Sequence, residues 1–174
     1  MPRVNGPEVV ALMAEIIRRS VGVELNDVQL ATALALHKQI HRRRRRRSVA
    51  EIARLSRLLP TRRDRSLVSV VPVFYGAYML GVDVVVLVGD EAEAREDATL
   101  YRQVATMAPT KADIYCNEEG LTAPTSGKTR IHVGPPELLR DLPGKAMIIS
   151  RLPAQRTGEL AAAMSGIVTL PEPD

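Results

Sequence analysis

Residue types that could bind phosphate occur in two stretches of this 174-residue chain. The first, Ser126-Gly127-Lys128-Thr129, matches the end of a phosphate-binding loop, Gly-x-x-x-x-Gly-Lys-Ser/Thr, whose glycines let backbone amides close on the phosphates. Thr122 stands at the position of the first glycine. The flanking segments are predicted to be a loop and a strand, whereas such a loop lies between a strand and a helix. We therefore interpret the match as fortuitous.

The second stretch is a run of six consecutive arginines, residues 42–47. The interval from Lys38 to Arg65 holds twelve basic and two acidic residues, a net charge of +10, whereas the rest of the chain carries −6. Such a local field attracts polyanions, namely nucleic acid, anionic lipid or an acidic protein face. Because neighbouring arginines repel one another, we expect the run to be solvated and mobile when unbound. A solvated loop without a dedicated ligand is the alternative.

Other chemistry is weakly represented. His41 and His132 have no acidic or cysteine companions at ligand spacing, and His37 is interpreted as a helix-surface or core histidine, so no metal site is predicted. A single cysteine excludes an intramolecular disulfide and favours a cytoplasmic protein. Five aromatic residues are too few for a single-strand nucleic-acid platform built on base stacking.

Three helices are predicted in the N-terminal part. One begins near Pro7, and a second is capped by Asn26. In the third, Ser48 and Glu51 form a capping box and Pro60 ends the helix. The arginine run then lies just ahead of a helix start, where the helix dipole disfavours positive charge. This placement favours a bound partner, or a loop held away from the helix.

Beyond residue 60 the pattern changes to alternating strands and helices. The predicted strands are 84–88, 112–116, 130–133, 145–149 and 167–170, and the predicted helices are 91–107, 136–142 and 158–164. This alternation predicts an α/β fold, a three-layer parallel sheet with helices on both faces, preceded by the N-terminal helices. We expect one domain over residues 1–170, with a basic insertion at 41–60 and a tail at 171–174. The uncharged stretch 67–82 is too short for a bilayer span, so no transmembrane segment is predicted.

Residues 26–96 resemble the opening of SecA-type protein-translocation motors, whose first lobe is a DEAD-like ATPase domain. The matching residues are Asp27-Val28-Gln29-Leu30, the Leu36-His37 pair, residues 67–75 at the position of the helix behind the phosphate loop, and Val86-Leu87-Val88-Gly89-Asp90 with Arg95. The resemblance implies a RecA-like, P-loop-like lobe. It also corrects one expectation, because propensity alone makes residues 67–71 a strand, whereas the family has a helix there.

The resemblance places a nucleotide site at Gln29, Arg65 and Ser66. In the family the matching glutamine contacts adenine, and Arg65 and Ser66 stand where the loop lysine and the magnesium-binding hydroxyl would be. Both loop glycines are replaced, by Arg62 and Asp64, although close backbone approach to phosphate favours glycine. The acidic magnesium motif is also missing, because the comparable strand continues into Ser150-Arg151-Leu152. We therefore expect a vestigial site with weak ATP binding or none, and no hydrolysis.

The sequence thus predicts a degenerate, single-lobe relative of SecA that binds a partner in protein targeting or export. We expect a cytoplasmic protein, peripheral to the inner face of the membrane if its basic segment rests there. The predicted partner-binding residues, for a protein partner such as translocation machinery or for a polyanion, are arginines: Arg42, Arg43, Arg44, Arg45, Arg46, Arg47, Arg62 and Arg63. Two alternatives stay open. One is a weak ATPase that uses Gln29, Arg65 and Ser66, or Lys128 and Thr129; the other is a sequence-nonspecific nucleic-acid-binding module.

Overall fold

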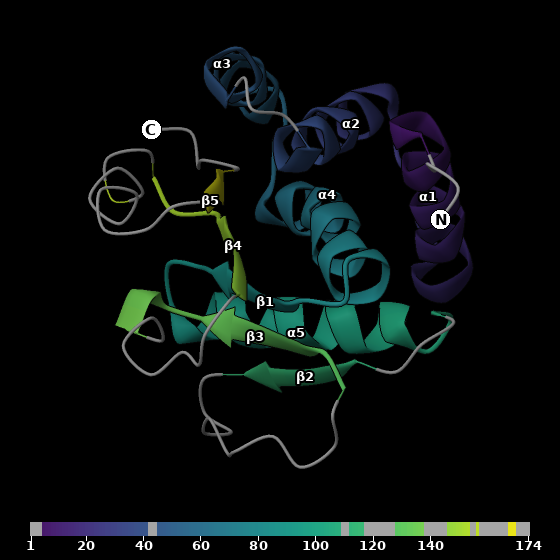
Figure 1. The fold of residues 1–174 in the computed structure, drawn as a ribbon, viewed down its shortest axis with the longest axis vertical. Helices are drawn as coiled ribbons and strands as arrows, with labels where there is room; N and C mark the ends of the chain where they lie inside the picture. Colours follow the sequence, from purple (N-terminus) through teal and green to yellow (C-terminus); the bar gives the residue numbers. More distant parts are fainter. Residues whose placement is uncertain are drawn as a thin grey trace.

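The computed structural model describes residues 5–41, 45–108, 112–116, 128–137, 146–153, 156 and 167–169. Helices form most of the N-terminal half, and all the described strands follow them (Figure 1). The elements in chain order are α1 (Gly6–Val21), α2 (Asp27–His41), α3 (Arg45–Ser56), α4 (Arg62–Phe74), the π-helix η1 (Tyr75–Met79), β1 (Asp83–Leu87), α5 (Glu91–Ala105), β2 (Asp113–Cys116), β3 (Arg130–Gly134), β4 (Ala146–Ser150) and β5 (Ile167–Thr169).

Side-chain caps fix the starts of the N-terminal helices. At α1 the Asn5 side chain accepts a hydrogen bond from the Glu8 amide, and the Glu8 carboxylate accepts one from the Asn5 amide. At α2 Asn26 and Gln29 exchange the same pair of bonds, so the cap predicted at Asn26 is confirmed. Each pair satisfies amides that the first helical turn leaves without a partner.

The third helix begins earlier than predicted. α3 starts at Arg45, so the last three arginines of the run are helical and Ser48 lies inside the helix; the capping box predicted there is wrong. Arginine is a good helix former, and the buried residues Ile52 and Leu55 attach α3 to the core. The first three arginines of the run lie outside the described residues, as do the side chains at 45–49.

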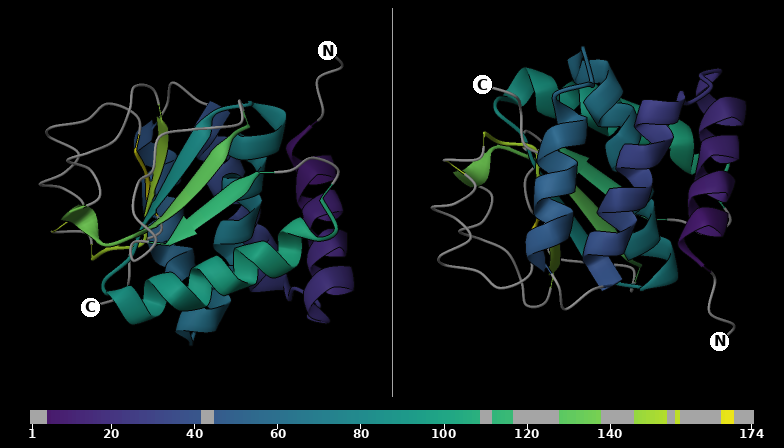
Figure 2. Two further views of the ribbon diagram at one scale, coloured as in Figure 1. Left: turned by 90° about the horizontal axis from the view of Figure 1, so that it is seen from below. Right: turned by 90° about the horizontal axis from the view of Figure 1, so that it is seen from above.

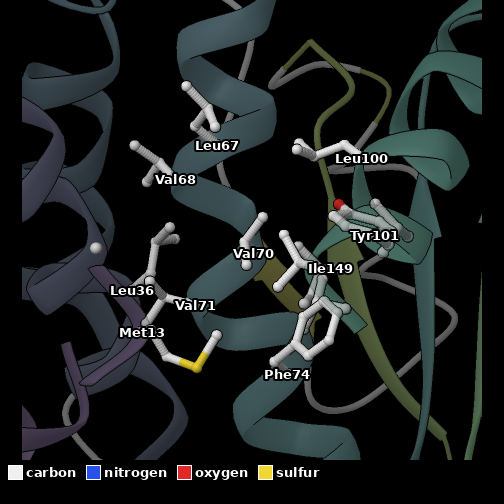
Figure 3. Close-up of a cluster of buried hydrophobic side chains, with 14 of the residues drawn as sticks. Met13, Leu36, Leu67, Val68, Val70, Val71, Phe74, Leu100, Tyr101 and Ile149 are labelled. Carbon is white, nitrogen blue, oxygen red and sulfur yellow. The ribbon is translucent and has the colours of Figure 1, made fainter. Parts of the chain in front are cut away.

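Residues 67–71 are helical, as the SecA-like register requires and propensity alone does not. They belong to α4, which Thr61 and Asp64 cap and in which every residue from Arg65 onward is buried. In Figure 3 this helix runs through the centre of the core, with Met13 and Leu36 on one side and Leu100, Tyr101 and Ile149 on the other. Packing on two sides outweighs the β preference of its valines.

The sheet has five parallel strands in the order β2-β3-β1-β4-β5. Val84 and Val86 of β1 point to the face on which α4 and α5 pack, and Val85 and Leu87 point to the opposite face; all four are fully buried. α2 packs on α1, α3 and α4 and also contacts β5. In the right view of Figure 2, α2 and α3 lie in front of the sheet. The predicted α/β class, a parallel sheet preceded by N-terminal helices, is confirmed. Helices on the face of Val85 and Leu87 stay a prediction, because α4 and α5 both pack on the other face.

Several predictions concern residues outside the described ranges. Of the helix predicted at 136–142 only Pro136 and Glu137 are described, as a short 3-10 turn, and the helix predicted at 158–164 lies outside. Residues 117–127 of the predicted loop and the tail at 171–174 also lie outside. Among the described residues, no helix has both the length and the apolar character that crossing a bilayer requires.

Candidate functional site

Gln29, in the first turn of α2, contacts the first turn of α4. Its side-chain Nε2 donates a 2.9 Å hydrogen bond to Oδ1 of Asp64, and its Oε1 accepts one of 2.8 Å from the Asn26 amide. The side chain is 3% exposed. Asp64 itself caps α4 by accepting from the amide and the hydroxyl of Thr61. The fold therefore brings Gln29 to the segment 61–66, with both ends of its side-chain amide hydrogen-bonded.

Arg65 and Ser66 point into the protein from the first turns of α4. Arg65 is buried and donates a hydrogen bond from its guanidinium to the carbonyl of Leu59 at 3.2 Å. The Ser66 hydroxyl lies 2.7 Å from Oδ1 of Asp97 on α5 and 3.0 Å from the Arg62 carbonyl. The three predicted nucleotide-site residues thus lie around one helix start, and each is hydrogen-bonded to another part of the fold.

A buried ion cluster adjoins Ser66. We define it as Ser66, Glu93, Asp97 and Arg151. Arg151 follows β4, and its guanidinium donates one hydrogen bond to Glu93 Oε1 at 2.6 Å and another to Asp97 Oδ2. Arg151 is 0% exposed, and the two carboxylates are almost as deeply buried. Taking these charges out of water is costly, and their mutual attraction and hydrogen bonds offset that cost.

Sheet and helix geometry place these four side chains together. The Arg151 amide donates to the carbonyl of Leu87, which extends the β1–β4 ladder by one residue and fixes the backbone of Arg151. Glu93 and Asp97 are four residues apart, so they share one face of α5. Burial by itself lowers the pKa of Arg151, but the negative charges of Asp97 and Glu93, with Tyr101, raise it above its ordinary value. The guanidinium therefore stays charged.

A second polar contact joins α4 and α5. The hydroxyl groups of Ser69 and Tyr101 are 2.7 Å apart, one helical turn beyond the Ser66–Asp97 contact. Tyr101 is fully buried, and burial, together with the nearby charge of Asp97, raises the pKa of its phenol. The phenol therefore stays neutral and holds the two helices together through its hydroxyl.

Sequence reasoning did not assign the acidic members of this cluster to a site. The signal was present, because Glu93, Asp97, Leu100 and Val104 follow a helical spacing on one face of α5. Polar residues on an otherwise apolar helical face indicate buried partners. The sequence drew attention to Arg151 only because it stands where the SecA family carries its acidic magnesium motif. Its two partners depend on how α5 packs against β4.

The predicted polyanion-binding residues are only partly described. Arg62 and Arg63 are exposed at the start of α4, and the Arg62 guanidinium lies 4.0 Å from the Asp90 carboxylate. Arg54 and Arg57 are exposed as well, and between Arg57 and Arg62 the side chain of Leu58 is 55% exposed. We call Arg54, Arg57, Arg62 and Arg63 the basic surface. Arg54 belongs to α3, Arg57 follows that helix, and Arg62 and Arg63 begin α4; both helices are labelled in Figure 1.

Neither the phosphate-loop match at Thr129 nor the histidines are supported as binding sites by their surroundings. Thr129 runs directly into β3, so the phosphate-loop match ending there is followed by a strand, as predicted from the sequence. His37 packs edge-on against Tyr75, and His132 stacks on Tyr115. Within the described part of the chain, no three His, Cys, Asp or Glu side chains gather closely enough to hold a metal ion.

Comparison with known proteins gives no relative. No protein-family model, curated protein or solved structure matches this chain. The SecA-like resemblance therefore stays a prediction, and the functional argument depends on the residues themselves.

Proposed function

We propose that this chain is a non-catalytic binding domain, similar to the first lobe of a SecA-type motor, that acts in protein targeting or export. It binds a protein partner through its arginine-rich segment and binds ATP weakly or not at all. Its place is the cytoplasmic side, where the basic segment can also rest on the anionic inner face of the membrane.

The observation that carries the non-catalytic part is the buried ion cluster beside Ser66. A phosphate-binding hydroxyl must face a ligand and a metal ion, whereas the Ser66 hydroxyl lies 2.7 Å from a carboxylate of the protein itself. Arg151 occupies the strand end where the family carries its acidic magnesium motif. An arginine offers no oxygen ligand to a cation. These contacts favour a structural role for the residues at the position of the SecA nucleotide site.

The charge distribution supports the partner-binding part. The segment 38–65 carries +10 and the remainder −6, so a negatively charged partner is attracted to this segment and repelled by the rest of the chain. Arginine suits a carboxylate-rich protein surface because its planar guanidinium forms two parallel hydrogen bonds. The exposed Leu58 adds an apolar contact within the basic surface.

Calorimetry with ATP and Mg²⁺ tests the non-catalytic part. We expect no saturable binding heat in the micromolar range for the wild-type protein. Tight, metal-dependent binding that is lost in Arg65→Ala would contradict the proposal and favour the weak ATPase instead.

Affinity capture from cells, followed by mass spectrometry, tests the partner. We expect translocation components to be retained by the wild-type chain and lost from Arg62→Glu/Arg63→Glu. These substitutions place acidic residues in the first turn of α4, where the helix dipole favours them, so the fold should survive. The control is Arg18→Gln/Arg19→Gln, which removes two exposed positive charges from the last turn of α1 without placing acidic residues beside Glu15, and it should retain the partner.

Salt dependence separates the nucleic-acid alternative. A wild-type chain that binds duplex DNA of unrelated sequences equally, with log affinity falling linearly with log salt, would replace the protein partner by a nucleic acid. Capture of no translocation component, or equal capture by both double variants, would also reject the proposal.

A further inference from the structure

β1 and β4 are neighbours in the sheet, but the chain leaves them in opposite directions. From β1 it passes through α5 to β2 on one side, and from β4 it continues to β5 on the other. In an open parallel sheet, ligands bind in the crevice outside the carboxyl ends of two such strands. Gly89 and Asp90 follow β1 here and are exposed, whereas Arg151 follows β4 and is fully buried.

Two hydrogen-bond donors at this position converge on one carboxylate. The Gly89 amide donates to Glu93 Oε2 at 3.0 Å, and the Arg151 guanidinium donates to Glu93 Oε1 at 2.6 Å. A backbone amide before a helix and an arginine are groups that proteins use to bind oxyanions. A Cβ at position 89 would lie 3.4 Å from Glu93 Oε2, so the carboxylate is in close contact with the bare backbone.

The carboxylate of Glu93 is held there as a bound anion would be. It belongs to the first turn of α5, where the helix dipole favours negative charge, and its side chain is 3% exposed. Asp97 also accepts a hydrogen bond from Arg151, so the cation keeps a counter-ion when Glu93 is removed. Among the described residues, the Nε of Arg151 has no hydrogen-bond partner, which leaves the buried guanidinium with one unused donor.

We propose that the Gly89 amide and Arg151 form an oxyanion site for a small carboxylate, and that Glu93 occupies this site as an internal ligand. In the wild-type protein the side chain of Glu93 keeps the site closed. Truncation of Glu93 leaves both donors in place around a space the size of a carboxylate group. The site shares no residue with the basic surface, although Asp90, the neighbour of Gly89, lies 4.0 Å from Arg62.

Thermal unfolding of Glu93→Ala in sodium formate, with sodium chloride at equal ionic strength as reference, tests the proposal. A ligand that binds only the folded state raises Tm saturably. At ten times its Kd, formate should raise the Tm of Glu93→Ala by about 4 °C above the chloride value. The wild-type protein should show no difference between the two salts.

Two variants control for general salt effects. Glu93→Gln fills the space with a neutral amide, and Glu91→Ala removes an exposed carboxylate from the same turn of α5. Neither should respond to formate beyond the chloride reference. An equal rise in all four proteins, or no rise in Glu93→Ala, overturns the proposal.

If Glu93→Ala is unfolded in plain buffer, refolding in the presence of formate replaces the thermal measurement. Dilution from urea into formate should then recover the native circular dichroism spectrum, whereas dilution into chloride should not. Failure to recover in either salt overturns the proposal.

Discussion

Arg151 is surrounded by protein on every side and compensates two carboxylates. Its guanidinium bonds both Glu93 and Asp97, and Asp97 in turn contacts Ser66 on α4. One side chain therefore links the end of β4 to α5 and, through Asp97, to α4. Replacing a whole buried ion pair by apolar residues changes the free energy of unfolding little. Removing only one partner lowers it strongly, because the other charge is left buried without a counter-ion.

Replacement of the arginine alone should therefore be strongly destabilising. We expect Arg151→Met to lower the free energy of unfolding by about 3–5 kcal/mol, because it leaves two buried carboxylates without a cation. Urea unfolding followed by circular dichroism measures the change. Arg95→Met is the control, because Arg95 is an exposed partner of Glu91 at 3.9 Å and its loss should cost about 0.5 kcal/mol or less. Equal losses in the two variants would show that the cluster contributes no more than a surface pair.

His132 is a buried histidine in β3 whose two ring nitrogens have no hydrogen-bond partner among the described residues. It stacks on Tyr115, with the ring centroids 5.3 Å apart. Burial lowers its pKa, the nearby cation of Arg130 lowers it further, and Asp83 partly opposes the shift. The folded protein therefore holds His132 neutral.

Stability should consequently fall in mild acid. An unfolded chain protonates His132 at the ordinary histidine pKa of 6.5, whereas the folded chain does so only at lower pH, so unfolding takes up a proton. The wild-type free energy of unfolding should decrease as the pH falls below about 6.5. His132→Phe keeps the stacking and removes the titration, so its urea midpoint should fall less between pH 7 and pH 5. Parallel curves for the two proteins would reject this role.

At the scale of the elements, α4 is the helix around which the core is organised. It contacts α1 and α2 on one side and the sheet and α5 on the other (Figure 3). It continues without a break into η1, where Gly76 faces Met147 of β4 and Val84 of β1. Close approach of this helix to the sheet needs a residue without a side chain.

Gly76→Ala should therefore overpack the interface between η1 and the sheet. Its Cβ would overlap Met147 Cε and lie 2.9 Å from Val84 Cγ2, so we expect a loss of about 1–3 kcal/mol. The double variant Gly76→Ala/Met147→Ala should recover part of this loss, because the shorter side chain at 147 makes room. A double-mutant cycle by urea unfolding measures the coupling. Strict additivity of the two losses would refute the contact.

α3 shows how local and global preferences compete within one element. The capping box at Ser48 is a good local signal, yet the helix extends three residues further back, into the arginines. Positive charge at a helix start is unfavourable, but arginine's helix propensity and the burial of Ile52 and Leu55 prevail. Capping signals therefore predicted this helix but misplaced its start.

At the scale of the whole molecule, β1 lies at the centre of the fold. It pairs with β3 on one side and β4 on the other, and residues Val84 to Leu87 are all 0% exposed. Its amides can exchange with solvent only when the sheet opens.

Native-state hydrogen exchange should report this arrangement. We expect amides of β1 to be among the slowest and to exchange with a free energy near that of global unfolding. Amides of β2, an edge strand with half-buried residues, should exchange faster. Equal protection of both strands would indicate that the sheet opens as one unit.

The sequence by itself determined most of the elements and the fold class. Short apolar runs bounded by turn residues predicted the strands within one or two residues, and alternation with helices predicted a parallel sheet. The charge asymmetry is likewise a property of composition alone. Such features depend on near neighbours in the chain, so periodicity and capping residues reveal them.

Only the tertiary structure decided how the polar residues inside are used. Gln29 meets Asp64 across 35 positions, and Arg151 meets Asp97 across 54, so no local pattern could pair them. Packing also decided that residues 67–71 form a helix, because burial on both sides outweighs a propensity difference of about 1 kcal/mol. A buried charge needs a partner of opposite charge, and which residue lies close enough depends on the packing of the whole chain.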